Sequence, residues 1–336
     1  MAGGGELIAS TWPRRARRLA IRLAIAVTVF AVTAEVLVRV FDPAGVTYFD
    51  EAERYGARLV RHEGFAYLHR PGDRFRLGGV DVRTNSLGLR GSEPPARDPS
   101  RRRLLVLGDS VVFGWGVEES ERFTSLLADS LAPEMDVVAA GAGSWNTRCE
   151  REWLRREGLR ALTPDVVLLV AATNDAIPQL DAAHDVPLER LQAHVDRPSR
   201  LRARLHRHSW AARTALLAAS QRRGLAAVER SLAPDSAAAQ DARRALEALV
   251  GDVRAAGARV LVLLYVDPAA RERAAFVRAY REPLESLDVD VVETPAALFD
   301  RSLRVSAADR HANAAGQAVL AEFLESWLRA RLRSHS

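Results

Sequence analysis

The chain has 336 residues, 48% of them hydrophobic, so it can bury a full core and hold one large domain with additional segments. Its single cysteine, Cys149, excludes an intramolecular disulfide and is expected to be a buried structural thiol. The net charge of +5 is concentrated in residues 1–41, where six arginines and two glutamates leave a balance of +4. The remainder is close to neutral, which argues against a nucleic-acid partner.

An apolar segment follows a basic N-terminus. Residues 1–18 end in a cluster of arginines, and residues 19–41 are apolar over most of their length. About 20 such residues cross the hydrocarbon core at 1.5 Å per residue. Arginines before the segment predict a cytoplasmic N-terminus and an exported remainder, that is, a single-pass protein of the cell membrane with a periplasmic domain. The alternative is a signal peptide cleaved after Ala34, but the apolar pattern continues past that residue and favours an uncleaved anchor.

Residues 42–100 form a polar lead-in that contains glycine and proline. Polar and apolar side chains alternate over 74–77 and 80–83 on either side of Gly78-Gly79, which predicts a β-hairpin. A proline-rich stretch at 94–99 then leads into the main domain, which we place at residues 101–333.

Within the main domain, short apolar runs alternate with helical patterns. Strands are expected over 103–108, 135–140, 165–172, 259–266 and 289–293, and helices near 119–131, 147–160, 238–256, 269–286 and 314–332. This alternation predicts an α/β fold with a parallel sheet covered on both faces.

A long insertion, 178–237, separates the third and fourth strands, and arginines and histidines crowd its middle. It has no carboxylates or cysteines at metal-ligand spacing, so we expect no metal site there. A solvated helix face, or a basic patch for an anionic glycan or lipid headgroup, fits the composition better.

The first predicted strand runs directly into Gly108-Asp109-Ser110. Open α/β sheets bind their ligands at the carboxyl ends of their strands. Ser110 is therefore a candidate nucleophile with backbone N–H groups nearby that could stabilise an oxyanion. The structural alternative is that Ser110 only caps the next helix.

Two further turns follow the second and third strands. Gly141 comes at the end of the second strand, where its N–H could be a second oxyanion donor. The alternative is an ordinary turn into a helix that is capped by Asn146 or Thr147. Asn174 follows the third strand and could donate a side-chain N–H to the same oxyanion, or could form an Asx-turn.

Asp309 and His311 precede the last helix. A histidine two residues after an aspartate can be a general base with its orienting carboxylate. The alternative is that Asp309 or Asn313 caps the helix while His311 rests on the surface. Serine, glycine, asparagine and Asp-x-His at one sheet edge are together the components of an acyl-transfer site.

These blocks, Gly108-Asp109-Ser110, Gly141, Asn174-Asp175 and Asp309-Arg310-His311, resemble those of the SGNH, or GDSL-type, hydrolase superfamily over about residues 100–332. The lead-in with Asn85 and Gly88-Leu89-Arg90, and the anchor with Glu35 and Arg39, are similar to a bacterial membrane-anchored subgroup. The resemblance implies a three-layer α/β/α fold with a five-stranded, mostly parallel, flavodoxin-like sheet. It also implies a serine esterase or acyltransferase that uses no metal or other cofactor.

Carried over by position, the resemblance makes Ser110 the nucleophile, His311 the general base and Asp309 its orienting carboxylate. The oxyanion donors would be the N–H groups of Ser110 and Gly141 and the side chain of Asn174.

Two positions depart from the family pattern. Ala172 stands where the third block usually begins with glycine, and Ala308 stands where Asp-x-x-His spacing would place the aspartate. The Asp-x-His spacing resembles variants in some anchored members and in alginate-acetylation relatives, and Asp300 is the remaining substitute for Asp309.

The expected activity is hydrolysis or transfer of an O-acyl group carried by a small molecule, glycan or lipid. A glycan O-acetyltransferase that works with a membrane acyl donor, and a non-catalytic envelope protein that retains the fold, are the alternatives.

Overall fold

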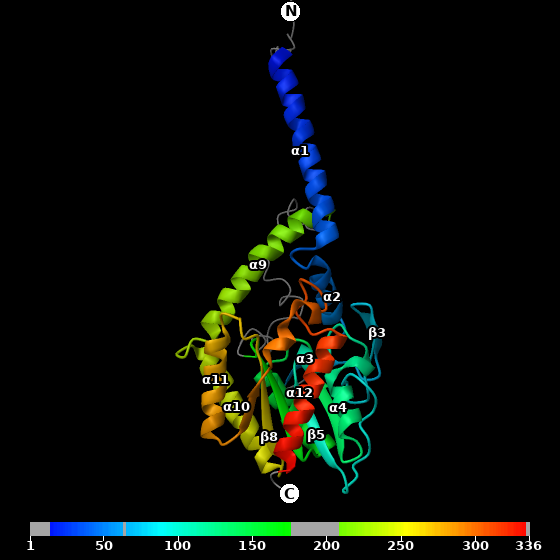
Figure 1. Ribbon diagram of the computed structural model, residues 1–336, viewed down its shortest axis with the longest axis vertical. Helices are drawn as coiled ribbons and strands as arrows, with labels where there is room; N and C mark the ends of the chain where they lie inside the picture. The colour runs from blue at the N-terminus through cyan, green and yellow to red at the C-terminus, as the bar shows by residue number, and fades with distance from the viewer. Residues whose placement is uncertain (1–13, 63–64, 176–207, 334–336) are drawn as a thin grey trace, which may run out of the picture. The chain divides into compact units, whose positions relative to one another are not determined.

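The computed structural model describes residues 14–62, 65–175 and 208–333 (Figure 1). The chain divides into two compact units, one made of residues 1–46 and 198–218 and the other of residues 47–197 and 219–336. Residues 1–13 of the basic N-terminus and residues 178–207 of the predicted insertion lie outside the described residues, and most of the arginines and histidines of the insertion lie there too.

The first unit contains a long apolar helix, α1 (Arg14–Phe41), whose residues are not buried. Within the described ranges, α1 is the one helix long and apolar enough to cross a membrane, and a signal sequence has the same properties. Glu35 of α1 accepts hydrogen bonds from the backbone N–H groups of Trp210 and Ala211, at 2.8 and 3.1 Å, where helix α9 (Trp210–Ser231) begins. Arg39 donates to the same carboxylate at 2.9 Å. Glu35 thus caps the N-terminus of α9 while it pairs with Arg39 of its own helix, α1.

The second unit is built on a five-stranded sheet with the strand order β6-β5-β7-β8-β9, in which all neighbouring strands are parallel. The strands are β5 (Arg102–Gly108), β6 (Met135–Gly141), β7 (Val166–Ala172), β8 (Arg259–Tyr265) and β9 (Asp290–Glu293). Because the strands point the same way, the loops that follow them open at one edge of the sheet.

Successive strand residues face two separate apolar cores. Leu105 and Leu107 of β5 belong to a core with helices α5 (Thr147–Trp153), α10 (Ala237–Ala255) and α11 (Arg273–Ser286). Leu104 and Val106 belong to the other core, with α4 (Phe123–Leu131) and α12 (Ala314–Arg333). A strand that is buried on both faces must be apolar throughout, and this explains the unbroken apolar runs of the sequence. The architecture is the predicted three-layer α/β/α fold (Figure 1).

The lead-in shares the first of these cores. It consists of helix α2 (Val46–Gly56), the hairpin β1–β2 (Leu59–His62 and Phe65–His69) and the expected hairpin β3–β4 (Arg74–Leu77 and Val80–Arg83). The Tyr55 hydroxyl accepts the Gly143 N–H at 2.6 Å and lies 2.8 Å from Nε2 of His69. The other ring nitrogen of His69 lies 3.0 Å from the Gly88 carbonyl, so Nδ1 donates and Nε2 accepts from Tyr55. This buried chain of hydrogen bonds ties the lead-in to the loop after β6.

All five predicted strands are confirmed to within one residue. The helix expected at 119–131 is interrupted at Arg122, whose buried guanidinium donates to the carbonyl oxygens of Arg90 and Val112. The helix expected near 147–160 continues through a π-helical segment, Leu154–Gly158, to Leu162. Helix α11 begins at Arg273 rather than at 269, because Asp267 holds the preceding residues in a turn. Helix α2 and the β1–β2 hairpin were not predicted.

Burial lowers the pKa of His69 to about 4, from an ordinary value of 6.5. The unfolded chain therefore binds the proton more readily, and the free energy of unfolding falls as the pH drops from about 6.5 towards 4. We predict that His69→Gln loses less stability than the wild type between pH 7 and pH 5, by up to about 1.4 kcal/mol per pH unit. Urea unfolding at the two pH values measures the difference. His208→Gln, at an exposed histidine, is the control that should follow the wild type.

Candidate active site

The segment after β5 makes a tight turn at the sheet edge. Ser110 begins a four-residue helix, α3 (Ser110–Phe113), and Asp109 caps it by accepting the Val111 N–H at 2.9 Å. The structure therefore assigns the cap to Asp109 rather than to Ser110, whose hydroxyl oxygen lies 3.3 Å from Oδ2 of the same carboxylate. Ser110 itself is half-buried, and Asp109 is 2% exposed.

The loop before α12 carries His311 and Asp309. Asn313 accepts the Gly316 N–H and thereby caps α12, so Asp309 is not needed for that task. The loop is fixed by a bridge between Arg304 and Ala312 and by a hydrogen bond from the Asp309 N–H to the Ser306 hydroxyl at 3.0 Å.

Ser110, His311 and Asp309 form a continuous chain of hydrogen bonds. Nε2 of His311 lies 2.8 Å from the Ser110 hydroxyl oxygen, and Nδ1 lies 2.6 Å from Oδ1 of Asp309. A carboxylate only accepts, so Nδ1 carries the proton and Nε2 accepts from Ser110. A hydroxyl on a neutral imidazole that is oriented by a carboxylate can lose its proton while it attacks an electrophile.

The turn after β7 brings Asn174 to the same place. Its side-chain amide donates to Oδ2 of Asp109 at 3.0 Å, and Asp175 folds back to accept the Ala172 N–H at 2.8 Å. An amide group has two N–H bonds, so one remains for a ligand. Ala172, where the family pattern has glycine, ends β7 and lines the cavity without disturbing the ladder to Tyr265.

Gly141 ends β6 and lies against the turn that carries Ser110. A side chain at this position would lie 2.8 Å from the Asp109 carbonyl oxygen and 2.9 Å from the Phe113 nitrogen. Glycine is therefore required for the close approach of β6 and α3, and its function as an oxyanion donor stays a prediction.

A cavity of about 310 Å³ opens over Ser110, Asn174 and His311. Tyr48 of α2, Tyr265 at the end of β8 and Phe299 supply apolar walls. Burial, together with the negative charges of Asp309 and Asp109, raises the pKa of Tyr48 to about 12, so its phenol is neutral at physiological pH.

The rim of the cavity carries both signs of charge. Arg304 lies 3.8 Å from Asp267 and donates to the Phe299 carbonyl oxygen, whereas Arg310 is exposed and Glu272 is half-buried. Both carboxylate and guanidinium groups thus line the opening, as a site with mixed charge does.

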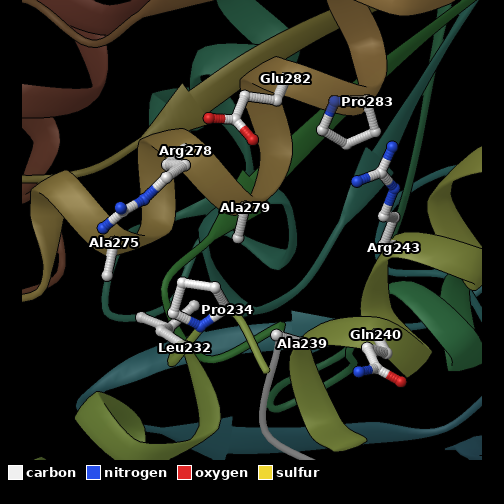
Figure 2. Close-up of a pocket in the computed structure, with 10 residues that line it drawn as sticks. All are labelled: Leu232, Pro234, Ala239, Gln240, Arg243, Ala275, Arg278, Ala279, Glu282 and Pro283. Atoms are coloured by element: carbon white, nitrogen blue, oxygen red, sulfur yellow. The ribbon is translucent and has the colours of Figure 1, made fainter. Parts of the chain in front are cut away.

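A second hollow, of about 130 Å³, lies between α10 and α11 (Figure 2). Figure 2 shows Arg278 and Glu282 of α11 across from Gln240 and Arg243 of α10. The described residues that line it include no hydroxyl, thiol or imidazole, so this hollow offers neither a serine or cysteine nucleophile nor a histidine base. Among the described residues, no group of three or more metal-binding side chains could hold a metal ion.

Two buried carboxyl groups interact with each other, that of Asp175, which follows Asn174 in the chain, and that of Glu150. Glu150 of α5 is 0% exposed. Among the residues that the structure describes, neither of its oxygens has a hydrogen-bond partner, and Oδ1 of Asp175 has none either. Burial raises the pKa of Glu150 well above its ordinary range, and the charge of Asp109 adds to the effect. Burial, together with the neighbouring charges of Glu150 and Asp109, also raises the pKa of Asp175 well above its ordinary range. Both groups are thus held towards the neutral form beside the turn that presents Asn174.

The structure brings together Ser110, His311, Asp309 and Asn174, all of which the sequence analysis singled out. Asp300 does not join them, because its carboxylate accepts from the N–H and hydroxyl of Ser302 and caps a short 3₁₀ helix. Sequence reasoning missed Tyr48 and Trp115, which both contact the His311 ring, with centroids 6.1 and 5.6 Å away. Their aromatic side chains gave no signal beyond that of ordinary core residues.

Comparison with known proteins now identifies the class. Residues 106–319, more than half of the chain, match the model of the GDSL-like lipase/acylhydrolase family. The chain therefore belongs to this family, and it is a hydrolase that acts on ester bonds. No curated protein sequence matches it.

Several solved structures are similar to the chain. The psychrotrophic esterase EstA from Pseudoalteromonas sp. has 15% identity and a TM-score of 0.45, over 69% of this chain and 99% of that one. TesA has 19% identity and a TM-score of 0.44, over 67% and 96%. The aryl esterase of M. smegmatis has 15% identity and a TM-score of 0.44, over 68% and 99%.

Removing the charge of one of the two buried acids is expected to stabilise the protein, and the size of this effect should depend on pH. Because its pKa is raised in the folded state, Glu150 favours folding at low pH and opposes it once the pH exceeds the unfolded value of about 4.3. We predict that Glu150→Gln increases the free energy of unfolding at pH 8 and that this gain disappears near pH 4. Urea unfolding of the wild type and the variant between pH 4 and pH 8 measures the difference in the free energy of unfolding.

Glu152→Gln, two residues along, is the matched control. Glu152 accepts hydrogen bonds from Arg155 and Arg156, so its loss should give no gain at pH 8. An equal gain in both variants would contradict the assignment of a neutral Glu150.

Proposed function

We propose that the protein is a membrane-anchored serine esterase that acts outside the cytoplasm, with Ser110 as nucleophile, His311 as general base and Asp309 as the carboxylate that orients it. The observation that supports this most strongly is the pair of short hydrogen bonds, 2.8 and 2.6 Å, that joins the three side chains. Membership of an ester-hydrolysing family supports the reaction type.

The reaction has two steps. The Ser110 oxygen attacks the ester carbonyl while its proton passes to Nε2 of His311, and the resulting imidazolium is stabilised by Asp309. When the carbon–oxygen bond of the ester breaks, Nε2 gives its proton to the departing alcohol. Water then attacks the acyl-serine, again with His311 as base, and releases the acid and the free serine.

The negative oxygen of each tetrahedral intermediate needs donors. We assign these to the N–H groups of Ser110 and Gly141 and to the side-chain amide of Asn174. The second amide N–H of Asn174 supports its part in this set, because Asp109 occupies only the first one and fixes the amide in place.

The location rests on α1. Its length and apolar surface, together with the arginines at its start, support a membrane anchor with the N-terminus in the cytoplasm and the catalytic unit in the periplasm. The ester substrate is then a small molecule, glycan or lipid of the cell envelope.

We predict that Asn174→Ala lowers kcat for a simple acetyl ester about 10²–10³-fold and leaves KM nearly unchanged, because an oxyanion donor acts only in the transition state. Ser110→Ala should remove the activity above background. Steady-state hydrolysis of p-nitrophenyl acetate measures both. A loss of tenfold or less for Asn174→Ala, with the fold intact, would argue against the assigned role.

The acceptor of the acyl group is tested in the same assay. With water as acceptor, added oligosaccharide leaves the rate of release of p-nitrophenol unchanged. A rate that rises with oligosaccharide, together with an acylated sugar in the products, would indicate transfer to a glycan, as a partner of a membrane acyl donor would perform it.

A further inference from the structure

The carboxylate of Asp309 accepts three hydrogen bonds, and one of them comes from the nucleophile's own segment. Oδ1 accepts both the backbone N–H of His311, at 3.0 Å, and its Nδ1–H. Oδ2 accepts the indole N–H of Trp115 at 3.0 Å, and both side chains are buried. Oδ1 thus has two donors from the histidine loop, and Oδ2 has one donor from the segment after Ser110.

The sequence Gly114-Trp115-Gly116 directs the indole to this position. Gly114 and Gly116 both have a positive φ, 75° and 78°, a conformation that favours glycine. The chain reverses here, so that the backbone N–H of Trp115 donates to the Ser110 carbonyl oxygen at 3.2 Å. A side chain at residue 116 would lie 2.7 Å from Val305, so this segment packs directly on the loop that carries Asp309.

Aromatic contacts hold the indole in one orientation. Tyr48 and Tyr55 of α2 meet it edge to face, at 5.8 and 5.2 Å between ring centroids. The His311 ring stacks on it at 5.6 Å with an angle of 25° between the ring planes. The indole face can also stabilise the imidazolium that forms during the reaction.

We infer that Trp115 is a positioning residue of this active site: its indole N–H orients the Asp309 carboxylate so that the compact Asp-x-His loop presents a correctly directed oxygen to His311. The inference depends on the proposed function of Asp309 and goes beyond it. In this short loop one carboxylate oxygen serves both the backbone and the ring of His311, and a donor on the other oxygen prevents rotation of the group. The lead-in takes part through Tyr48 and Tyr55, which hold Trp115.

The test is a double-mutant cycle with Trp115→Phe and Asp309→Ala, measured as kcat and KM for p-nitrophenyl acetate with the full chain in detergent. Phenylalanine keeps an aromatic ring and removes the N–H. Since a hydrogen bond to a charged group is lost, Trp115→Phe should lower kcat about tenfold to a hundredfold with little change in KM. In the Asp309→Ala background, the same substitution should change kcat less than threefold.

Two variants separate a local role from general damage. Replacing Trp115 with 3-benzothienylalanine keeps the size and shape of the indole and exchanges the N–H for sulfur, so it should reproduce the loss even if Trp115→Phe folds poorly. Trp145→Phe is the matched control: this buried indole donates to the Tyr67 carbonyl oxygen, and its loss should show no coupling to Asp309→Ala.

The outcomes distinguish this inference from the proposed function. An equal loss from Trp115→Phe in both backgrounds, or unchanged kcat in the benzothienylalanine variant, would overturn the positioning role of Trp115 and leave the nucleophile in place. Full activity in Ser110→Ala would instead overturn the proposed function itself.

Discussion

The Asp309 carboxylate is the point at which three parts of the chain meet. One oxygen holds His311 in the loop before α12, and the other holds Trp115 in the segment that follows Ser110. Tyr48 and Tyr55 of the lead-in pack on that same indole. A carboxylate that is 5% exposed is costly to bury unless its oxygens are paired, and here both are, so the pairing that satisfies the charge also sets the geometry of the histidine.

The parallel sheet makes this meeting possible. Gly108 pairs in register with Gly141 on one side and with Val170 on the other, so the loops after β5, β6 and β7 emerge side by side. Ser110 and Asn174 come from two of these loops. The Asp109 carboxylate links the loops, because it accepts the Val111 N–H beside Ser110 and the side-chain amide of Asn174. Buried apolar strands supply rigidity, and the short polar turns at their ends supply the chemistry.

Local patterns were sufficient to predict the five strands and the β3–β4 hairpin. They also singled out four residues whose side chains the structure brings together, Ser110, Asn174, Asp309 and His311. Apolar runs of strand length and polar residues at strand ends are local signals. The hydrogen bond from Trp115 to Asp309 could not be predicted in this way, because the two residues are 194 positions apart and a buried tryptophan is ordinarily a core residue. The buried state of Glu150 was equally hidden, since a glutamate on a helix is usually exposed. Helix α2 was missed because its aromatic residues Tyr48 and Tyr55 pack on the main domain, and no local pattern in the sequence indicates that packing.

The most direct test of the account is to find which residue a fluorophosphonate modifies. We would treat the full chain, Ser110→Ala and His311→Ala with the reagent and locate the adduct by peptide mass spectrometry. We expect one adduct, on Ser110, in the wild type, none in Ser110→Ala, and a strongly slowed reaction in His311→Ala. An adduct at another residue, equal labelling of His311→Ala, or no labelling of the folded wild type would contradict the claim that His311 activates Ser110.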